Sequence, residues 1–173
     1  MWRTLFRERL RLAVHLEPRD TAIYALVPAR ADRRLGPQLT RSPHDCAALT
    51  AAPPPPTRAT LPSDAEVLAT CGSLFLPGRM IVGGTQLSTF ATTLGASGLV
   101  DRLVEDRTGL DGYYTFTLTY APAARPGADS PGTGADAPSI FTALREQLGL
   151  ELQPARTSLQ TVVIDRLEPP TEN

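Results

Sequence analysis

The amino-acid sequence predicts an α+β domain built from two related lobes, each a helix packed on an antiparallel sheet in a βαββ-like repeat. The first observation behind this prediction is an internal echo: FRERLRLAV at residues 6–14 returns as LREQLGLEL at residues 144–152. The second is that apolar and polar residues alternate in several short segments, as they do in half-buried strands. The third is that other segments carry apolar residues at helical spacing. Together they predict one helix–strand–strand unit used twice.

The first lobe is expected within residues 1–41. Its residues 2–10 carry an apolar stripe that predicts a short helix, and residues 10–16 then alternate as a strand. Residues 18–20 (Pro-Arg-Asp) predict a turn, because proline and aspartate favour turn positions. Residues 21–27 would then supply the second strand of a hairpin.

Residues 42–78 are expected to form a proline-rich loop that separates the lobes. Four consecutive prolines at positions 53–56 exclude a helix or a central strand there and favour polyproline II. Cys46 and Cys71 bracket these prolines.

The second lobe is expected within residues 79–173. Its first half is predicted to contain a strand at 79–84, a helix over 87–94, and strands at 103–106 and 113–120. The last of these strands has the clearest alternation in the chain, because aromatic residues and leucine occupy every second position and threonines lie between them.

The second half of this lobe begins with a flexible loop at 122–137, which is rich in Pro, Gly, Ser and Asp. Pro138 marks a helix start, and Gly149 marks the end of that helix because glycine tolerates a left-handed backbone. Residues 150–153 and 159–165 are predicted to repeat the hairpin of the first lobe.

Composition excludes several classes of function. The 173 residues carry a net charge of −1, and all 17 basic residues are scattered arginines, so we expect no nucleic-acid or anionic-membrane partner. No apolar run approaches the ~20 residues that span a bilayer. Residues 2–12 contain too many arginines for the apolar core of a signal peptide, so we identify no signal peptide in this chain.

Candidate catalytic and metal-binding residues are few. His15 is a candidate general base, although its place on the polar face of a strand favours a cross-strand partner such as Tyr24. No motif supplies a nucleophile, a phosphate loop or a dinucleotide site, so we expect no cofactor. Zinc-ligand atoms are carried by His44, Asp45, Cys46 and Cys71, but no Cys-x-x-Cys spacing is present, and we expect no metal.

The densest constellation of turn-forming residues lies in segment 106–112 (DRTGLDG). An aspartate followed closely by threonine and glycines is typical of a rigid corner between two strands. The residues interpreted as structural are Thr108, Gly109 and Gly112. The residues that would line a recognition edge under the alternative, functional interpretation are Asp106, Arg107 and Asp111.

Segment 104–118 (VEDRTGLDGYYTFTL) resembles the V-x-D-x-T-G-L-x-G-x-Y-x-F-x-L signature of a large soil-bacterial, Acidobacterial-type family described as a domain of unknown function. Residues 137–150 (APSIFTALREQLGL) are similar to a second signature of that family, and 163–165 with 170–173 match its usual C-terminus. Residues 5–27 are similar to its opening pattern. The residues in register with that opening are His15, Glu17, Arg19 and Tyr24.

Members of this family usually carry further residues before the opening pattern, beginning with a signal peptide, so this chain resembles an N-terminally truncated member. The resemblance implies a periplasmic or secreted protein, and in some members the domain follows a membrane-bound sensor metallopeptidase. It implies no catalytic residues. In layout alone, the chain is also similar to the small N-terminal domains of secretins and TonB-dependent receptors, which are protein-interaction modules.

The expected function is a non-enzymatic extracytoplasmic module for binding, sensing or protein interaction. Its expected partner is another protein, or a second copy of the chain, at an exposed sheet edge of the first lobe. Two alternatives remain: a hydrolase-type enzyme of unrecognised class that uses His15 with an acidic partner, and a regulatory partner of a membrane metallopeptidase. If the protein is exported, Cys46 and Cys71 are expected to form a disulfide, and otherwise to remain free thiols.

Overall fold

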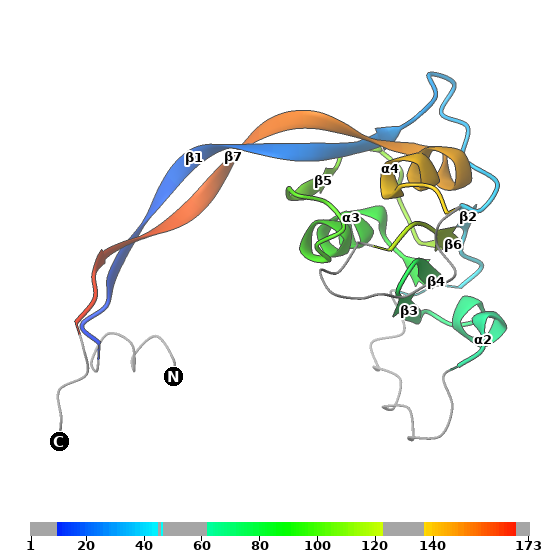
Figure 1. The fold of residues 1–173 in the computed structure, drawn as a ribbon, viewed down its shortest axis with the longest axis horizontal. Helices are drawn as coiled ribbons and strands as arrows, with labels where there is room; N and C mark the ends of the chain where they lie inside the picture. The colour runs from blue at the N-terminus through cyan, green and yellow to red at the C-terminus, as the bar shows by residue number, and fades with distance from the viewer. Residues whose placement is uncertain (1–9, 45, 47–61, 123–136, 169–173) are drawn as a thin grey trace. The chain divides into compact units, whose positions relative to one another are not determined.

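The computed structural model describes residues 10–44, 46, 62–122 and 137–168. Helices and strands are both present, so the predicted α+β class is confirmed (Figure 1). The elements, in chain order, are β1 (Ala13–Pro28), β2 (Thr40–Arg41), α2 (Asp64–Leu68), β3 (Ser73–Leu76), β4 (Arg79–Thr85), α3 (Leu87–Ala96), β5 (Val104–Asp106), β6 (Tyr114–Thr119), α4 (Ile140–Ala143), η1 (Leu144–Leu148) and β7 (Leu150–Arg166). The helix expected over residues 2–10 and most of the loop expected at 122–137 lie outside the described residues.

Contacts between residues divide the chain into two compact units. Unit 1 consists of residues 1–22 and 156–173, and unit 2 consists of residues 23–155. Strands β1 and β7 belong in part to each unit. We call the described part of unit 1, residues 10–22 and 156–168, the ribbon.

The strands form two sheets. The first has the order β5-β1-β7, and β5 runs parallel to β1, with Tyr24 opposite Val104 and Leu26 opposite Asp106. The second has the order β2-β6-β4-β3 and is antiparallel throughout. The parallel pair departs from the purely antiparallel sheets that we expected. It arises because β5 pairs with a strand that is remote in sequence, whereas the antiparallel expectation came from local hairpins.

Neither of the two predicted hairpins forms, and those predictions are wrong. Strand β1 continues through residues 18–20, and β7 continues through Pro154. Instead, the two long strands pair with each other: Ala29 N donates to Gly149 O near one end (2.8 Å), and Glu168 N donates to Leu10 O near the other (2.9 Å). They are therefore antiparallel partners. Proline is tolerated in strands that lie at a sheet edge, so the prolines that were interpreted as turn signals do not interrupt them.

The pairing of β1 with β7 requires a different interpretation of the similar sequences at residues 6–14 and 144–152. The two similar segments do not build two separate helix–strand–strand lobes, as we expected. The first segment instead leads into β1 and the second leads into β7, and these two strands form a single antiparallel pair, which Figure 1 shows side by side. The sequence pattern indicated strands after both segments, but periodicity carries no information about which strands pair.

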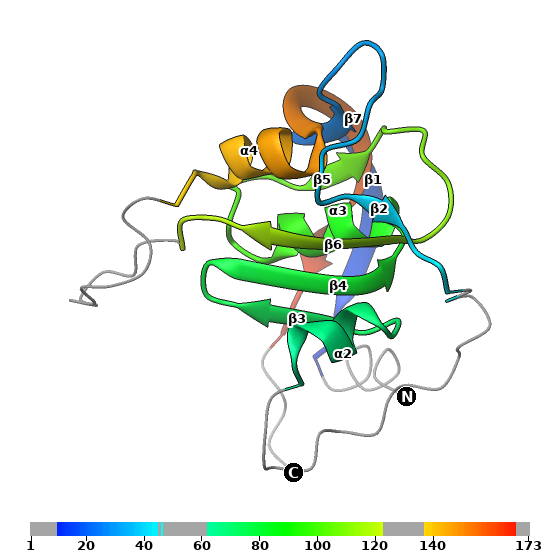
Figure 2. The same ribbon diagram turned by 90° about the vertical axis from the view of Figure 1, so that its right-hand side faces the viewer.

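The hydrophobic core lies in unit 2, where α3 packs against the four-stranded sheet (Figure 2). The predicted alternation in β6 is confirmed, because Tyr114, Phe116 and Leu118 are buried. The predicted helical stripe is also confirmed, and its Phe90 meets Phe116 edge to face at 4.9 Å between ring centroids. Aromatic pairs in this geometry add about 0.5–1.5 kcal/mol beyond the burial of their area.

Two elements, α2 and β3, lie in the region that we expected to be a loop. Helix α2 begins after a capping box, in which Glu66 N donates to Ser63 Oγ and Ser63 N donates back to the Glu66 carboxylate. The Ser63 hydroxyl also donates to this carboxylate and, with the backbone bond, lowers the pKa of Glu66. The Ser-x-x-Glu spacing was the sequence signal for this helix. We did not predict this helix, because the four prolines at positions 53–56 led us to interpret all of residues 42–78 as a loop.

The last helix begins after Ser139, which is the residue that follows the predicted start at Pro138. The Ser139 hydroxyl caps the helix by accepting a bond from Thr142 N. It passes into the wider π-helical turn η1 and ends at Gly149, whose φ of 69° confirms the left-handed end. The Gln147 side chain bonds the backbone of Thr119 twice, by accepting from its N–H (2.9 Å) and donating to its carbonyl (2.7 Å). The Gln147 amide thus satisfies both backbone groups of Thr119 on the side of β6 where no described strand pairs with that residue.

The Gly83→Ala substitution tests how closely α2 packs on β4. A methyl group at Gly83 would overlap the carbonyl oxygens of Val67 and Thr70, which are backbone atoms that cannot rotate away. We expect the free energy of unfolding to fall by about 3 kcal/mol, at the upper end of the usual cost of overpacking. The measurement is urea unfolding followed by circular dichroism.

Gly72→Ala is the matched control, because its added methyl would meet only the movable Thr70 hydroxyl at 3.1 Å. A loss at Gly83 no larger than that at Gly72 would show that α2 does not pack on β4 as described.

Candidate functional site

Side chains of the ribbon divide between two faces, because successive residues of a strand point to opposite sides. His15 on β1 bonds Asp165 on β7, so odd-numbered residues of both strands share one face. Asp20 bonds Arg156 at 2.6 Å, so even-numbered residues share the other. The two cross-strand contacts agree on a single assignment of faces.

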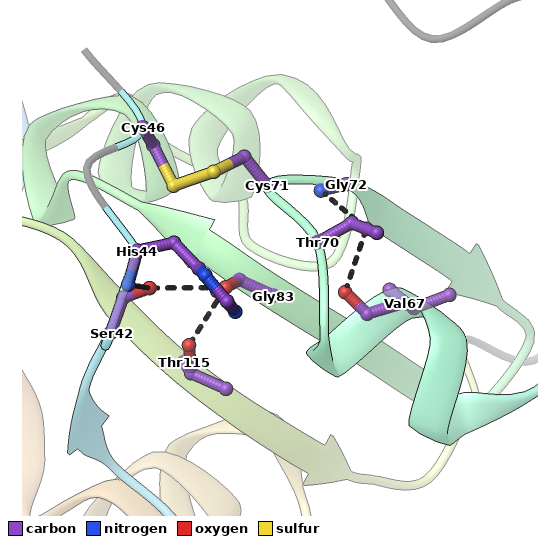
Figure 3. The surroundings of a disulfide bond; sticks show 9 residues. All are labelled: Ser42, His44, Cys46, Val67, Thr70, Cys71, Gly72, Gly83 and Thr115. Carbon is purple, nitrogen blue, oxygen red and sulfur yellow. Dashed lines mark hydrogen bonds between the residues drawn. A yellow bond between two sulfur atoms is a disulfide. The ribbon is translucent and has the colours of Figure 1, made fainter. Parts of the chain in front are cut away.

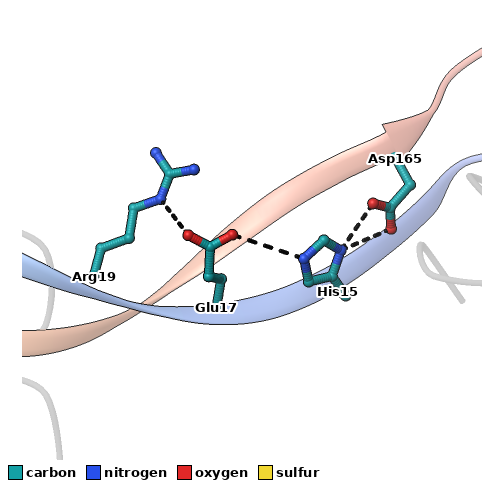
Figure 4. A network of polar contacts seen from close by, with 4 residues as sticks. All are labelled: His15, Glu17, Arg19 and Asp165. Atoms are coloured by element: carbon teal, nitrogen blue, oxygen red, sulfur yellow. Dashed lines mark hydrogen bonds and ion pairs between the residues drawn. The ribbon is translucent and has the colours of Figure 1, made fainter.

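A chain of polar contacts covers the odd-numbered face (Figure 4). His15 Nδ1 lies 2.8 Å and 3.0 Å from the two carboxylate oxygens of Asp165. His15 Nε2 lies 3.9 Å from the Glu17 carboxylate, which accepts a bond from Arg19 Nε at 3.1 Å. Residues 15, 17 and 19 come together because they alternate along one strand, whereas Asp165 is brought to them by the pairing of β7 with β1.

The expected pairing of His15 with Tyr24 is wrong. Tyr24 lies further along β1 in unit 2, where its ring contacts Phe141 edge to face and Arg102 lies over it at 5.1 Å. The sequence could not identify Asp165 as the partner, because residues 15 and 165 meet only through the pairing of strands from opposite ends of the chain.

The histidine–carboxylate pair resembles part of a catalytic triad in geometry alone, since a carboxylate at one ring nitrogen fixes the tautomer of the other. The His15 side chain is 53% exposed and that of Asp165 45%, so water reaches both. Within the described residues, the ring bonds or faces only carboxylates, and no hydroxyl or thiol is hydrogen-bonded to it. Among the described residues, the arrangement therefore lacks a nucleophile placed for activation.

Part of the even-numbered face of the ribbon is apolar and exposed, although Asp20 and Arg156 lie on the same face. The large aliphatic side chains that are exposed on this face are Val14 (48% exposed), Leu16 (63%), Val162 (58%) and Ile164 (60%). Two strands alone are marginally stable in water, and a second layer normally covers the apolar face of a sheet. The sequence alternation had indicated an apolar face here, but it could not show that the described chain leaves the face uncovered.

Among the strands that the structure describes, β7 is the last in the sheet order, so no described strand pairs with its outer edge. Every second residue of β7 directs its N–H and C=O groups toward this outer edge. Residues 157–164 (TSLQTVVI) contain no charge, proline or glycine. Natural edge strands usually carry such residues to discourage pairing, as residues 17–20 of β1 (EPRD) do.

Segment 106–112 forms a closed turn. The Asp106 carboxylate accepts bonds from Thr108 N at 2.9 Å and Thr108 Oγ1 at 2.7 Å, and Thr108 Oγ1 accepts one from Leu110 N. Thr108 is fully buried. Gly109 (φ 65°) and Gly112 (φ 97°) adopt the left-handed backbone that other residues avoid. These contacts support the structural interpretation of Thr108 and both glycines.

The polar side chains proposed for a recognition edge are partly engaged in this structure. Arg107 pairs with Glu105 at 2.9 Å, and the Asp106 carboxylate is bonded within the turn, whereas at Asp111 it is the backbone carbonyl that accepts a bond, from the Tyr114 hydroxyl. Arg33 reaches the turn from another segment and donates to the Thr108 carbonyl at 3.1 Å. A recognition role for Asp106, Arg107 and Asp111 remains a prediction.

A disulfide joins Cys46 to Cys71, with Cα atoms 5.7 Å apart (Figure 3). It packs on the glycine pair of β4, because any side chain at Gly84 would overlap the Cys46 sulfur. The neighbouring Gly83 carbonyl accepts bonds from the Thr115 hydroxyl at 2.8 Å and the Ser42 hydroxyl at 3.4 Å. The disulfide therefore anchors the segments before and after the prolines to the sheet, in agreement with the pairing expected for an exported protein.

Two features are absent from the described residues. No group of three or more histidine, cysteine, aspartate or glutamate side chains is placed to hold a metal ion. Across the same residues, no helix is both long enough and apolar enough to cross a membrane.

The fold and the site thus define a disulfide-linked α+β domain with an exposed, two-faced strand ribbon. The family model for a protein of unknown function, DUF3738, matches residues 1–167, and the chain belongs to this family. Comparison with curated proteins and with solved structures found no match to either.

The Thr108→Val substitution tests the closed turn. Valine keeps the shape of threonine but removes the hydroxyl, which leaves Leu110 N and the Asp106 carboxylate each without one hydrogen bond. We expect the free energy of unfolding to fall by about 1–3 kcal/mol, the cost of unsatisfied buried polar groups. Urea denaturation measures it, with Thr108→Ser as the control that keeps the hydroxyl. A valine variant no less stable than the serine variant would contradict the assignment.

Removal of the disulfide tests how much it contributes to the free energy of unfolding. Because the bond closes a loop between residues 25 apart in sequence, the Cys46→Ser, Cys71→Ser double variant should lose about 3 kcal/mol of unfolding free energy. Chemical reduction of the unchanged protein should give a similar loss in the same denaturation assay. If neither treatment lowers the midpoint of unfolding, the two segments are held to the sheet by other contacts.

Proposed function

We propose that this chain is a non-enzymatic protein-interaction module that binds its partner through the ribbon. The observation that carries the proposal is the row of exposed aliphatic side chains on the even-numbered face of a two-stranded sheet. Soluble proteins rarely leave a contiguous apolar patch open unless it serves an interaction. A partner that covers this face would also stabilise two strands that are marginal by themselves.

The proposed mode of binding is strand addition at the open edge of β7. No described strand pairs with this edge, so its outward N–H and C=O groups can hydrogen-bond an extended segment of another chain. Backbone bonds would supply affinity, and the alternating side chains of residues 157–164 would select partners that match them.

The proposed location is extracytoplasmic, and the Cys46–Cys71 disulfide supports it. Structural disulfides form and persist in the periplasm and outside the cell, whereas the cytosol keeps thiols reduced. A periplasmic or secreted module that exposes an apolar ribbon would meet its partner at or beyond the cell envelope.

A hydrolase-type activity is the second candidate, and the Asp165 carboxylate at His15 Nδ1 is the observation that favours it. Two features argue against it. The pair is half exposed, so no desolvated pocket strengthens its electrostatics. The second ring nitrogen, which would have to accept a proton from a nucleophile, faces the Glu17 carboxylate.

Hydrolysis of p-nitrophenyl acetate and p-nitrophenyl phosphate separates the two candidates. We expect the unchanged protein, His15→Ala and Asp165→Asn to hydrolyse both compounds at the same background rate, because the side chains bind each other and activate nothing. Each variant should lose less than about 1 kcal/mol of unfolding free energy, as exposed ion pairs do. A loss of rate by about 100-fold or more in either variant would instead identify a general base.

Photo-crosslinking tests the ribbon as the binding surface. The photoreactive residue benzoylphenylalanine replaces Val162 on the apolar face, and in a matched control it replaces Thr92, an exposed residue of α3. After irradiation in an envelope extract of the source cells, we expect discrete adducts from position 162 and none from position 92. Adducts from neither position, or equally from both, would reject the ribbon as an interaction surface.

A further inference from the structure

We infer that the partner at the edge of β7 is a second copy of this chain, and that the two β7 strands pair antiparallel about a twofold axis at Gln160. The inference rests on the proposed function and names its partner. It follows from three properties of the ribbon: the sequence along the open edge, the placement of charge around it, and the number of backbone bonds that self-pairing would form.

Residues 157–164 are suited to pair with themselves. They are uncharged, and five of them are β-branched: Thr157, Thr161, Val162, Val163 and Ile164. β-Branched side chains pack well on the pleated surface of a sheet. In an antiparallel arrangement, the start of this run lies opposite its end in the other copy, so apolar and threonine side chains meet across the axis.

Repulsion between like charges decides at which residue the twofold axis passes. The uncharged residues 157–164 are centred between residues 160 and 161, so the axis passes at one of these two residues. An axis at Thr161 would place Arg156 directly opposite Arg166 of the second copy, and like charges directly opposite are destabilising. An axis at Gln160 places Arg156 opposite Ile164 instead, and Ser158 opposite Val162. The favoured register is therefore centred on Gln160.

The ribbon as a whole presents no net charge to a second copy. It contains equal numbers of arginines and acidic residues, and they pair locally: Arg11 and Arg166 with Glu168, Arg19 with Glu17, and Arg156 with Asp20, while Asp165 faces His15. Net repulsion, which commonly keeps like surfaces apart, is absent between two such ribbons.

The hydrogen bonds of self-pairing match those of a specific interface. The outward-facing residues of each strand between positions 155 and 165, which are every second residue, would exchange bonds in pairs, which gives about 10–12 backbone bonds. Specific protein interfaces contain about 10 direct hydrogen bonds. Pairing also converts two marginal two-stranded ribbons into one four-stranded sheet. The contact is narrow, so association should depend on protein concentration.

Cysteine crosslinking tests the register. With the axis at Gln160, the two copies of residue 160 lie about 4.5–5.5 Å apart between Cα atoms, within the range that a disulfide bridges. Residue 158 lies on the same face, but it would be four positions out of register with its own copy, about 13 Å away along the strands. Both native cysteines are already paired with each other. Gln160→Cys should therefore form a covalent dimer, and Ser158→Cys is its matched control.

The experiment oxidises both variants at increasing dilution and separates them on non-reducing gels. We expect Gln160→Cys to yield dimer at concentrations at least 10-fold lower than Ser158→Cys. Equal crosslinking of both variants would indicate random collision and overturn the inference. Sedimentation velocity of the unchanged protein provides a second measurement that needs no substitution. A mass increase with concentration supports the second copy, and a monomer at every concentration overturns it.

Failure of this inference is distinguishable from failure of the proposed function. If benzoylphenylalanine at position 162 captures a protein of different mass while Gln160→Cys does not dimerise, the ribbon binds a foreign partner and the inference is wrong. If position 162 captures nothing and the cysteine variant stays monomeric, the ribbon is not an interaction surface and both proposals fail.

Discussion

The pairing of β1 with β7 is the constraint on which the rest of the structure depends. It joins the two ends of the described chain, from the Leu10–Glu168 bond to the Ala29–Gly149 bond. Within unit 2, β1 also pairs with β5, and Leu26 on β1 is part of the core. In unit 1 the same two strands are all that the structure describes, so each face of the ribbon depends on their register. A shift by one residue would exchange the polar and apolar faces.

Two adjacent glycines play a corresponding part within unit 2. Gly83 and Gly84 lie where the register between β4 and β6 shifts, as in a β-bulge. The absence of a side chain lets the end of α2 and the disulfide sulfur approach the strand backbone closely. The Gly83 carbonyl then accepts hydroxyl bonds from two neighbouring segments. The backbone at these two glycines thereby contacts a helix, a disulfide and a neighbouring strand, which explains why side chains are absent there.

Local patterns predicted the elements that depend on local chemistry. The alternation of β6, the stripe of α3 and the left-handed end at Gly149 all follow from side chains and backbone within a few residues. The predicted turns at residues 18–20 and around Pro154 failed, because strand pairing along the whole length of β1 and β7 outweighs the turn preference of single prolines. At the candidate site, His15 and the alternation of the ribbon were visible in advance. Asp165 as the partner of His15 was not, because 150 positions separate the two residues.

The sequence by itself determined the α+β class, most elements of unit 2, the turn chemistry of residues 106–112 and the two cysteines available for a disulfide. These features depend on interactions between near neighbours, whose spacing is written in the chain. Tertiary structure alone decided that β1 and β7 are partners, that Asp165 faces His15, and that Val14, Leu16, Val162 and Ile164 share an exposed face. Such relations depend on which distant strands meet and in what register, and burial across the whole fold sets that choice.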